Sequence, residues 1–230
     1  MVMRSLQQLN ATLIACERCP RLIAHCRAVA LTKRRAYQDD VYWGRPVPGG
    51  GDPQARVLLV GLAPGAHGSN RTGRMFTGDG SAEFLTPALH RAQFSNSPIS
   101  IHRDDGLQLN DIYILAAAHC APPDNKPTPQ EIANCRPYFI QHLRLLTQVR
   151  VIVALGKIAF DSTLATLNEM GVEIPSPKPQ FAHNVEYAVG PYTLLGSYHP
   201  SRQNTQTGRL TAAMLDAVFE RARQRMEERM

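Results

Sequence analysis

Cysteine side chains form two pairs whose spacing could bind a metal centre. Cys16 and Cys19 are separated by two residues, and Cys120 and Cys135 are separated by fourteen. Four thiolates can bind either Zn²⁺ or an iron–sulfur cluster. A zinc ribbon normally uses two short Cys-x-x-Cys knuckles, and this chain has one, so the spacing favours the bulkier cluster. The fifth cysteine, Cys26, is expected to pack in the core.

Two other interpretations of these cysteines stay open. Cys135 could be a small core residue, and Cys16 with Cys19 could be a thiol-exchange motif. An exchange motif of the thioredoxin kind follows a strand, whereas Cys16 follows an expected helix. In a reducing cytosol, clustered cysteines indicate metal binding or redox chemistry rather than disulfides.

A long polar loop follows the first expected strand. It runs from Gly61 to Asp79 with the sequence GLAPGAHGSNRTGRMFTGD. It has neither the dinucleotide-binding spacing nor the Walker lysine of a nucleotide-phosphate loop. Its glycines let backbone amides approach an anion, Arg71 and Arg74 add positive charge, and Phe76 offers a flat stacking surface. These residues favour a binding site over a plain surface loop.

A histidine follows the last expected strand. His199 precedes Pro200 and a polar, basic segment from Ser201 to Asn204. A lone histidine is more often an ordinary polar residue. Its position at the carboxyl end of a strand, where open α/β sheets bind ligands, predicts a role in a site shared with the glycine-rich loop.

Four short apolar runs predict the strands that position these motifs. The runs are 57–62, 112–116, 151–155 and 193–197, and the helical segments are 81–94, 128–146, 157–170 and the segment from about 211 onward. Continuous apolar strands separated by helices indicate a parallel sheet covered on both faces. We therefore expect one α/β domain over residues 1–230, a three-layer α/β/α structure with a central four-stranded, mainly parallel sheet.

The clearest helix start lies between the third and fourth cysteines. Thr128 can cap the helix, Pro129 suits its first turn, and Glu131 completes a capping box. The apolar stripe of this helix places Cys135 on the buried face. Gly171 is expected just past the C-terminus of the helix over 157–170.

Charge and hydropathy narrow the class of protein. Lys and Arg number 25 against 19 Asp and Glu, which gives a net charge of +6. This excess suits a polyanionic partner, although scattered surface charge explains it equally well. The sequence contains no apolar run of the roughly 18 residues that a membrane helix needs, and its N-terminus lacks the pattern of a signal peptide. We therefore expect a cytoplasmic protein with no membrane association.

The order of these motifs resembles that of the uracil-DNA glycosylase superfamily, most closely its iron–sulfur branch, family 5. The matching features span nearly the whole chain: the cysteine pair at 16 and 19, the loop 61–79, the stretch 120–125, Cys135, and the motif His199-Pro200-Ser201. The resemblance implies a base-excision-repair enzyme that hydrolyses the N-glycosidic bond of uracil in DNA. It also implies a [4Fe-4S] cluster bound by Cys16, Cys19, Cys120 and Cys135, which would brace the fold rather than take part in catalysis.

Two positions differ from the neighbouring family 4. That family has an acidic residue where this chain has Leu62, and a base-reading Asn where the alignment falls near Ala116. The small side chains at 116–118 leave a roomier pocket. The resemblance to family 5 therefore implies a broader substrate range that includes hypoxanthine and other deaminated bases.

The resemblance also assigns roles to single residues. A base inside a duplex has to be flipped into a pocket before its glycosidic bond can be cleaved. Asp79 would orient water or stabilise the sugar cation, His199 would hydrogen-bond the leaving base, and Asn125 would position the water or the base. Phe76 would stack on the base. The alternatives are a core role for Phe76 and an ordinary turn role for Asn125.

Further residues are expected to contact the base or the DNA. The segment Ser201 to Gly208 would enter the DNA and fill the gap left by flipping. Arg209 is a further candidate for a phosphate contact. The complete set of expected base- and DNA-binding residues is Gly61, Ala63, Gly65, Phe76, Arg71, Arg74, Ser201, Arg202, Gln203 and Asn204.

Two other functions fit parts of the pattern. One is a non-catalytic binder of damaged DNA, which would release no base. The other is an iron–sulfur electron carrier, which would show no preference for DNA. The presence of Asp79 and His199 argues against the first, and the Arg and Phe content of the loop argues against the second. We expect a monomer that acts on double- and single-stranded DNA containing uracil or other deaminated bases, and the sequence identifies no protein partner.

Overall fold

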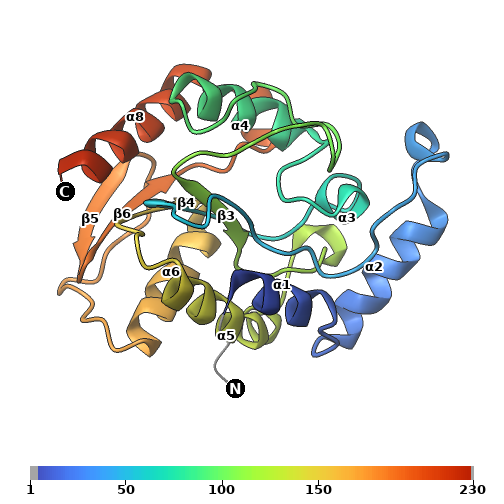
Figure 1. Cartoon of the computed structure of the whole chain (residues 1–230), viewed down its shortest axis with the longest axis horizontal. Coiled ribbons are helices and arrows are strands. Elements are labelled where there is room, and N and C mark those ends of the chain that lie inside the picture. Colours follow the sequence, from blue (N-terminus) through green and yellow to red (C-terminus); the bar gives the residue numbers. More distant parts are fainter. Residues whose placement is uncertain (1–4, 229–230) are drawn as a thin grey trace.

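The computed structural model describes residues 5–228 and contains one six-stranded sheet (Figure 1). Its centre consists of β3 (Ile112–Ala116), β2 (Val57–Gly61), β4 (Val151–Leu155) and β6 (Tyr192–Ser197), which pair in parallel in that order. These are the four strands predicted from the apolar runs. Every residue of β2, β3 and β4 is buried, as expected for a parallel sheet covered on both faces.

The prediction of a four-stranded sheet is incomplete, because the structure has an additional antiparallel strand at each edge of the sheet. At one edge β1 (Gly50–Gly51) pairs with β3, and at the other β5 (Val185–Val189) pairs with β6. Two glycines form no apolar run, and four of the five β5 residues are only partly buried or exposed. Neither edge strand therefore has the continuous apolar pattern that marks the central strands.

Helices cover both faces of the sheet. On one face lie α4 (Gly80–Arg91) and α8 (Ala212–Glu228), and on the other lie α1 (Leu6–Ile14), α5 (Pro129–Leu145) and α6 (Lys157–Glu169) (Figure 1). The side chains of each strand alternate between two cores. Val57 and Leu59 pack beneath α4 and α8, whereas Leu58 and Val60 pack against α5 and α6.

The predicted helix signals are confirmed. The Thr128 hydroxyl accepts a hydrogen bond from the Glu131 amide, and the Glu131 carboxylate accepts one from the Thr128 amide. Cys135 lies on the buried face of α5. Gly171 follows α6 with a φ of +85°, a conformation that favours glycine.

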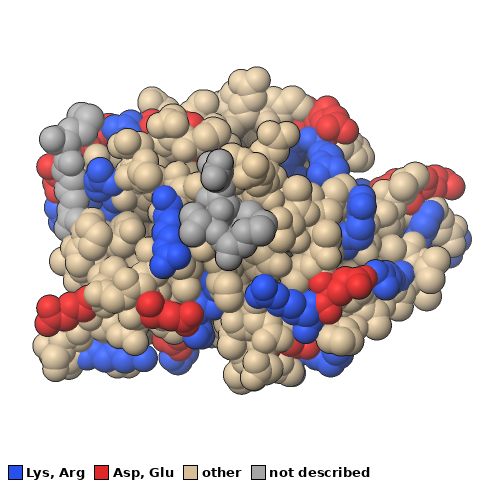
Figure 2. Space-filling view, turned by 60° about the horizontal axis from the view of Figure 1, so that its bottom comes forward, with Lys and Arg blue, Asp and Glu red and all other residues tan. Residues whose placement is uncertain are grey.

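Five further helical segments complete the described part of the chain, residues 5–228. They are α2 (Pro20–Thr32), the longest of them, α3 (Ser69–Thr72), α7 (Arg202–Gln206) and the 3₁₀ turns 35–37 and 123–125. Within residues 5–228, no helix is long and apolar enough to cross a membrane. The face seen in Figure 2 carries basic and acidic side chains interspersed, so the net positive charge is not gathered there.

Candidate active site

A cavity of about 580 Å³ lies at the carboxyl edge of the sheet. The loop after β2, the turn before α5 and the segment after β6 all contribute to it, and together they bring Phe76, Asp79, Asn125 and His199 to its walls. The other predicted residues that line it are Gly61, Ala63, Gly65, Ser201, Arg202 and Gln203. The parallel order of β3, β2, β4 and β6 explains this convergence, because their carboxyl ends meet at the same edge.

The two carboxylate oxygens of Asp79 have different surroundings. Oδ1 accepts hydrogen bonds from the amides of Ser81 and Ala82, both at 3.0 Å, and so caps the N-terminus of α4. Oδ2 faces the backbone of Gly65 and Gly68, where an added methyl group would collide with it. Within residues 5–228, Oδ2 has no hydrogen-bond partner. One oxygen is therefore held by the protein, and the other is available to a ligand.

Opposing effects act on the pKa of the Asp79 carboxyl group. Burial raises the pKa of Asp79 above its ordinary value, while the amides of Ala82 and Ser81 and the nearby Arg202 guanidinium oppose the rise. A carboxylate with a raised pKa is a better proton acceptor than an exposed one when it is ionised. The position suits a group that activates water or faces a developing positive charge.

His199 contributes a neutral imidazole. Burial lowers the pKa of His199 to about 4, so the ring is uncharged at neutral pH. Its backbone carbonyl accepts hydrogen bonds from the Asn204 side chain at 2.9 Å and from the Ser201 amide at 2.8 Å, which fixes the loop. Among the described residues, its ring nitrogens have no hydrogen-bond partner. One of them can therefore donate its N–H to a ligand in the cavity.

Phe76 forms an aromatic wall beside His199. The two ring centres are 6.0 Å apart, with an angle of 34° between the planes. The Phe76 ring rests on the end of β2, where a Cβ at Gly61 would lie 2.9 Å from it. Phe76 has a φ of +47°, which is unusual for a bulky residue and indicates a conformation imposed by its surroundings.

Asn125 lies on a turn with left-handed backbone at the rim of the cavity. Asp124 and Asn125 are consecutive and both have positive φ, at 53° and 56°. Both side chains are exposed and both residues line the cavity. Asp and Asn adopt left-handed backbone more readily than other non-glycine residues, so their side chains suit this turn.

Three predicted residues lie outside the cavity lining. The Arg71 side chain is 4% exposed, pairs with Asp40 and donates to the carbonyls of His67 and Gly78. Its guanidinium also stacks on Tyr37 at 4.0 Å. This buried arginine holds the loop together, and a DNA contact by it stays a prediction.

Arg74 and Asn204 likewise have internal partners. Arg74 forms a two-pronged ion pair with Asp105 and also donates to Thr77 and Ser100. Asn204 holds the His199 carbonyl, as described above, and Ser201 caps the helix α7 that occupies the segment predicted to be a loop. The DNA contacts predicted for both residues stay untested.

The flank of the glycine-rich loop rests on Trp43. The backbone of Gly73 packs against the indole ring, where an added Cβ would lie 2.8 Å away. The guanidinium groups of Arg45 and Arg103 each lie 4.2 Å from the ring centre, and the indole N–H donates to the Pro46 carbonyl. This stack fixes the loop from outside the cavity.

Sequence reasoning missed one group of cavity residues. Arg34 and Tyr37, from the segment between α2 and β1, line the cavity together with His67. Arg34 and Arg202 are its two lining arginines, and within residues 5–228 neither has an ion-pair partner. No motif marks Arg34. The irregular, basic segment around it was the available signal.

The four predicted metal ligands lie in one region of the fold, and none of them lines the cavity. Cys19, Cys120 and Cys135 are buried, and Cys16 is partly buried. Hydrogen bonding to Cys26 and burial raise the pKa of Cys120, with Cys135 and Cys16 adding to the effect. Burial raises the pKa of Cys135 to about 12, and Cys19 and Cys16 add to that rise. These mutual effects place the four sulfurs in one neighbourhood.

Polar groups and the fifth cysteine surround the four predicted ligands. Within residues 5–228, no three His, Cys, Asp or Glu side chains converge closely enough to hold a single ion. The Asn134 side chain donates to the Cys19 sulfur at 3.4 Å, and Cys26 donates to the Ala121 carbonyl. Cys26 is also hydrogen-bonded to Cys120, so it lies in the same group, and the nature of a bound metal centre stays a prediction.

Comparison with known proteins identifies the family. Residues 48–223 match the model of the uracil DNA glycosylase superfamily. The type-5 uracil-DNA glycosylase of Thermus thermophilus is 53% identical over 92% of this chain and 94% of its own length. The type-5 enzyme of Mycobacterium tuberculosis is 50% identical over 95% of this chain and 81% of its own length. A type-4 uracil-DNA glycosylase of Pyrobaculum aerophilum is 28% identical over 85% of the chain. This chain is therefore a member of the uracil-DNA glycosylase superfamily.

Proposed function

We propose that this chain is a DNA glycosylase of the type-5 kind that removes uracil, and also hypoxanthine, from DNA and leaves an abasic site. The observation that carries the proposal is the meeting of Asp79, His199 and Phe76 in one cavity at the carboxyl edge of the sheet. Relatives named type-5 uracil-DNA glycosylase match nearly the whole chain.

The base is bound by flipping it out of the helix. The Phe76 ring offers a stacking surface, and base–aromatic stacking contributes about 1–3 kcal/mol. The His199 ring lies beside Phe76 and donates its N–H to a carbonyl oxygen of the base. Uracil and hypoxanthine both carry such an oxygen where the undamaged bases cytosine and adenine carry an amino group, which has no acceptor to offer.

Bond cleavage then separates charge between the sugar and the base. The electrons of the C–N bond leave with the base, and the neutral His199 stabilises the negative charge that develops on its oxygen. The Asp79 carboxylate faces the sugar with its free oxygen, stabilises the positive charge and accepts a proton from the water that attacks the sugar carbon. Asn125, on the rim, orients that water.

The two lining arginines suit the DNA backbone on either side of the flipped nucleotide. Arg34 and Arg202 are exposed and have no ion-pair partner among residues 5–228. Phosphate contacts of this kind fix the register of a protein on DNA without reading sequence.

The direct test uses oligonucleotides that each carry one uracil or one hypoxanthine, in double- and single-stranded form. The purified chain is incubated with each, and abasic sites are cleaved with alkali. We expect strand scission for both bases and none for matched strands that carry cytosine or adenine at the same position. Binding without scission by folded, cluster-containing protein would show a non-catalytic binder instead.

We further propose that Cys16, Cys19, Cys120 and Cys135 hold a [4Fe-4S] cluster. A bound cluster would cross-link the N-terminal segment to α5, an association that the Arg21–Glu131 ion pair at 2.8 Å already makes. Such a cluster would serve structure, because hydrolysis of a glycosidic bond involves no electron transfer. Anaerobically purified protein should be brown, with broad absorption near about 400 nm and about four irons per chain. Colourless protein with one zinc per chain would contradict this assignment.

A further inference from the structure

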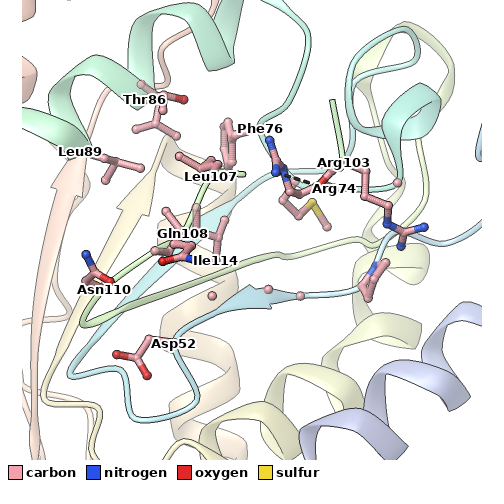
Figure 3. Close-up of a pocket in the computed structure, with 18 of the residues that line it drawn as sticks. Asp52, Arg74, Phe76, Thr86, Leu89, Arg103, Leu107, Gln108, Asn110 and Ile114 are labelled. Atoms are coloured by element: carbon pink, nitrogen blue, oxygen red, sulfur yellow. Dashed lines mark hydrogen bonds between the residues drawn. The ribbon is translucent and has the colours of Figure 1, made fainter. Parts of the chain in front are cut away.

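A second cavity shares the Phe76 wall with the catalytic cleft. It has a volume of about 620 Å³, and Phe76 and Met75 line both spaces. Leucines from α4 and from the 103–110 loop and Ile114 of β3 make much of its wall. Figure 3 shows Phe76 and Leu107 at one end of this cavity and Asn110 and Asp52 at the other.

The backbone of Phe76 is fixed. Its carbonyl accepts a hydrogen bond from the Ser100 hydroxyl at 3.0 Å, and that hydroxyl also contacts Thr77 at 2.9 Å and Arg74 at 3.0 Å. Arg74 is in turn anchored by Asp105. Whatever Phe76 does to accommodate a ligand, it must therefore do by side-chain rotation.

The phenyl ring, by contrast, makes no polar bond and is only partly buried. It rests on Gly61 and His199 on the cleft side. Towards the second cavity it faces a space much larger than itself, lined by Leu85, Leu107 and neighbouring side chains. An aromatic side chain moves between a few staggered positions, and a well-packed interior normally leaves only one of them open. Here the adjacent hollow leaves room for a second.

The two proposed substrates differ in size in a way that matters at this wall. Uracil has one ring and hypoxanthine has two, and both must place a carbonyl oxygen near His199. The floor of the cleft is formed by β2 and the backbone at Gly61, which cannot retreat because these strand residues are buried in the sheet. Phe76 is the wall with empty space behind it.

We propose that Phe76 is a retractable wall that sets the size of base admitted. Resting on Gly61, the ring closes the cleft around a pyrimidine. When the ring turns into the second cavity, the cleft has room for a purine, which then no longer stacks on Phe76. This inference rests on the proposed glycosylase function and explains how one site takes both base sizes.

The test is to fill the second cavity without touching the cleft. Leu107→Trp places a large side chain at the Phe76 end of the second cavity. Leu107→Phe fills less of the cavity and serves as a second variant in case the tryptophan prevents folding. Asn110→Trp adds the same bulk at the far end and is the matched control. Thermal unfolding confirms that each variant is folded, and single-turnover excision is measured on uracil and hypoxanthine strands.

We expect Leu107→Trp to lower hypoxanthine excision at least about tenfold relative to uracil excision, with Leu107→Phe intermediate. Asn110→Trp should keep the wild-type ratio. An unchanged ratio in both folded Leu107 variants would overturn the inference and leave the glycosylase function standing. If the wild-type chain releases uracil but never hypoxanthine, the inference is likewise overturned and the glycosylase function stands. If it releases neither base, the proposed function itself is wrong.

Discussion

At the scale of single residues, the two carboxylate oxygens of Asp79 have different roles. Oδ1 caps α4, and Oδ2 faces the cavity without a partner among residues 5–228. A single substitution to alanine would remove both functions and confuse a loss of stability with a loss of chemistry. Asparagine removes only one, because its side-chain oxygen is also a good helix cap.

We expect Asp79→Asn to lower the rate of uracil excision by about 10²-fold or more while leaving the unfolding temperature nearly unchanged. Asp79→Ala should lose the same activity and in addition about 1 kcal/mol of stability. Single-turnover excision and thermal unfolding of both variants measure the two effects separately. A wild-type rate in folded Asp79→Asn would exclude the carboxylate from the reaction.

The two titrating groups of the site predict the direction of the pH dependence. Burial raises the pKa of Asp79, and the ionised carboxylate is the active form, so excision should rise as pH increases through that raised pKa. Burial lowers the pKa of His199 to about 4, so this ring is uncharged near neutral pH and adds no limb there. A rate–pH profile should therefore show one acidic limb above the ordinary aspartate pKa. Loss of activity between pH 6 and 8 through protonation of an imidazole would contradict the neutral role of His199.

Whether the surroundings of a site residue could be predicted from the sequence depended on where its partners lie in the chain. The places of Asp79 and His199 in the cavity were predictable because Asp79 ends the loop that follows β2 and His199 comes two residues after β6. Arg71 and Arg74 have the composition of phosphate ligands, yet their partners Asp40 and Asp105 lie about 31 residues away in the chain. A pattern within the loop contains no information about such pairs.

At the scale of elements, the glycines of the loop after β2 make room for the Asp79 carboxylate. Gly65 and Gly68 pack their backbones directly against Asp79. A side chain at either position would displace the carboxylate from its place between the loop and α4. At these two positions glycine permits the close approach of the loop backbone to the carboxylate.

This packing predicts that Gly68→Ala lowers uracil excision by at least about tenfold, because the new methyl group overlaps the Asp79 carboxylate. Gly50→Ala is the matched control, since nothing lies within 4 Å of the added methyl there. Excision rates and thermal unfolding of both variants should separate a displaced carboxylate from a general loss of fold. Equal rates for the two variants would show that the carboxylate tolerates the shift.

The central elements were predictable and the edges were not. Continuous apolar runs mark β2, β3 and β4, and a capping box marks the start of α5. The edge strands β1 and β5 have no such pattern, and the segment expected to be a loop after His199 folds into α7 because Ser201 caps it. Short elements at the surface depend on tertiary contacts more than on local pattern.

At the scale of the whole molecule, the segment between α2 and β1 contributes to the cavity although it contains none of the sequence motifs. It brings Arg34 to the cavity that already holds Arg202. The excess of positive charge in the sequence did not reveal this, because many of the arginines pair within the protein, as Arg71, Arg74 and Arg91 do. Composition indicated a polyanionic partner, and only the fold shows which cations line the cavity.

The salt dependence of DNA binding tests this assignment. Each phosphate contact releases counterions, so Arg34→Gln and Arg202→Gln should each reduce the slope of log affinity against log salt by about one. Arg27→Gln is the control, because Arg27 is exposed, pairs with Glu17 and does not line the cavity. Fluorescence anisotropy of labelled uracil-containing DNA at several salt concentrations gives the slopes. Equal slopes for all three variants would place the phosphate contacts elsewhere.

The stack on Trp43 has a practical consequence. Trp43 is the one tryptophan of the sequence, and two guanidinium groups and the Gly73 backbone enclose its ring. Its emission is thus an intrinsic spectroscopic reporter on the glycine-rich loop, recorded without any dye. If only the Phe76 side chain moves when a purine enters, the emission maximum should be the same with uracil- and hypoxanthine-containing strands. A spectral shift specific to hypoxanthine would instead reveal displacement of the loop as a whole.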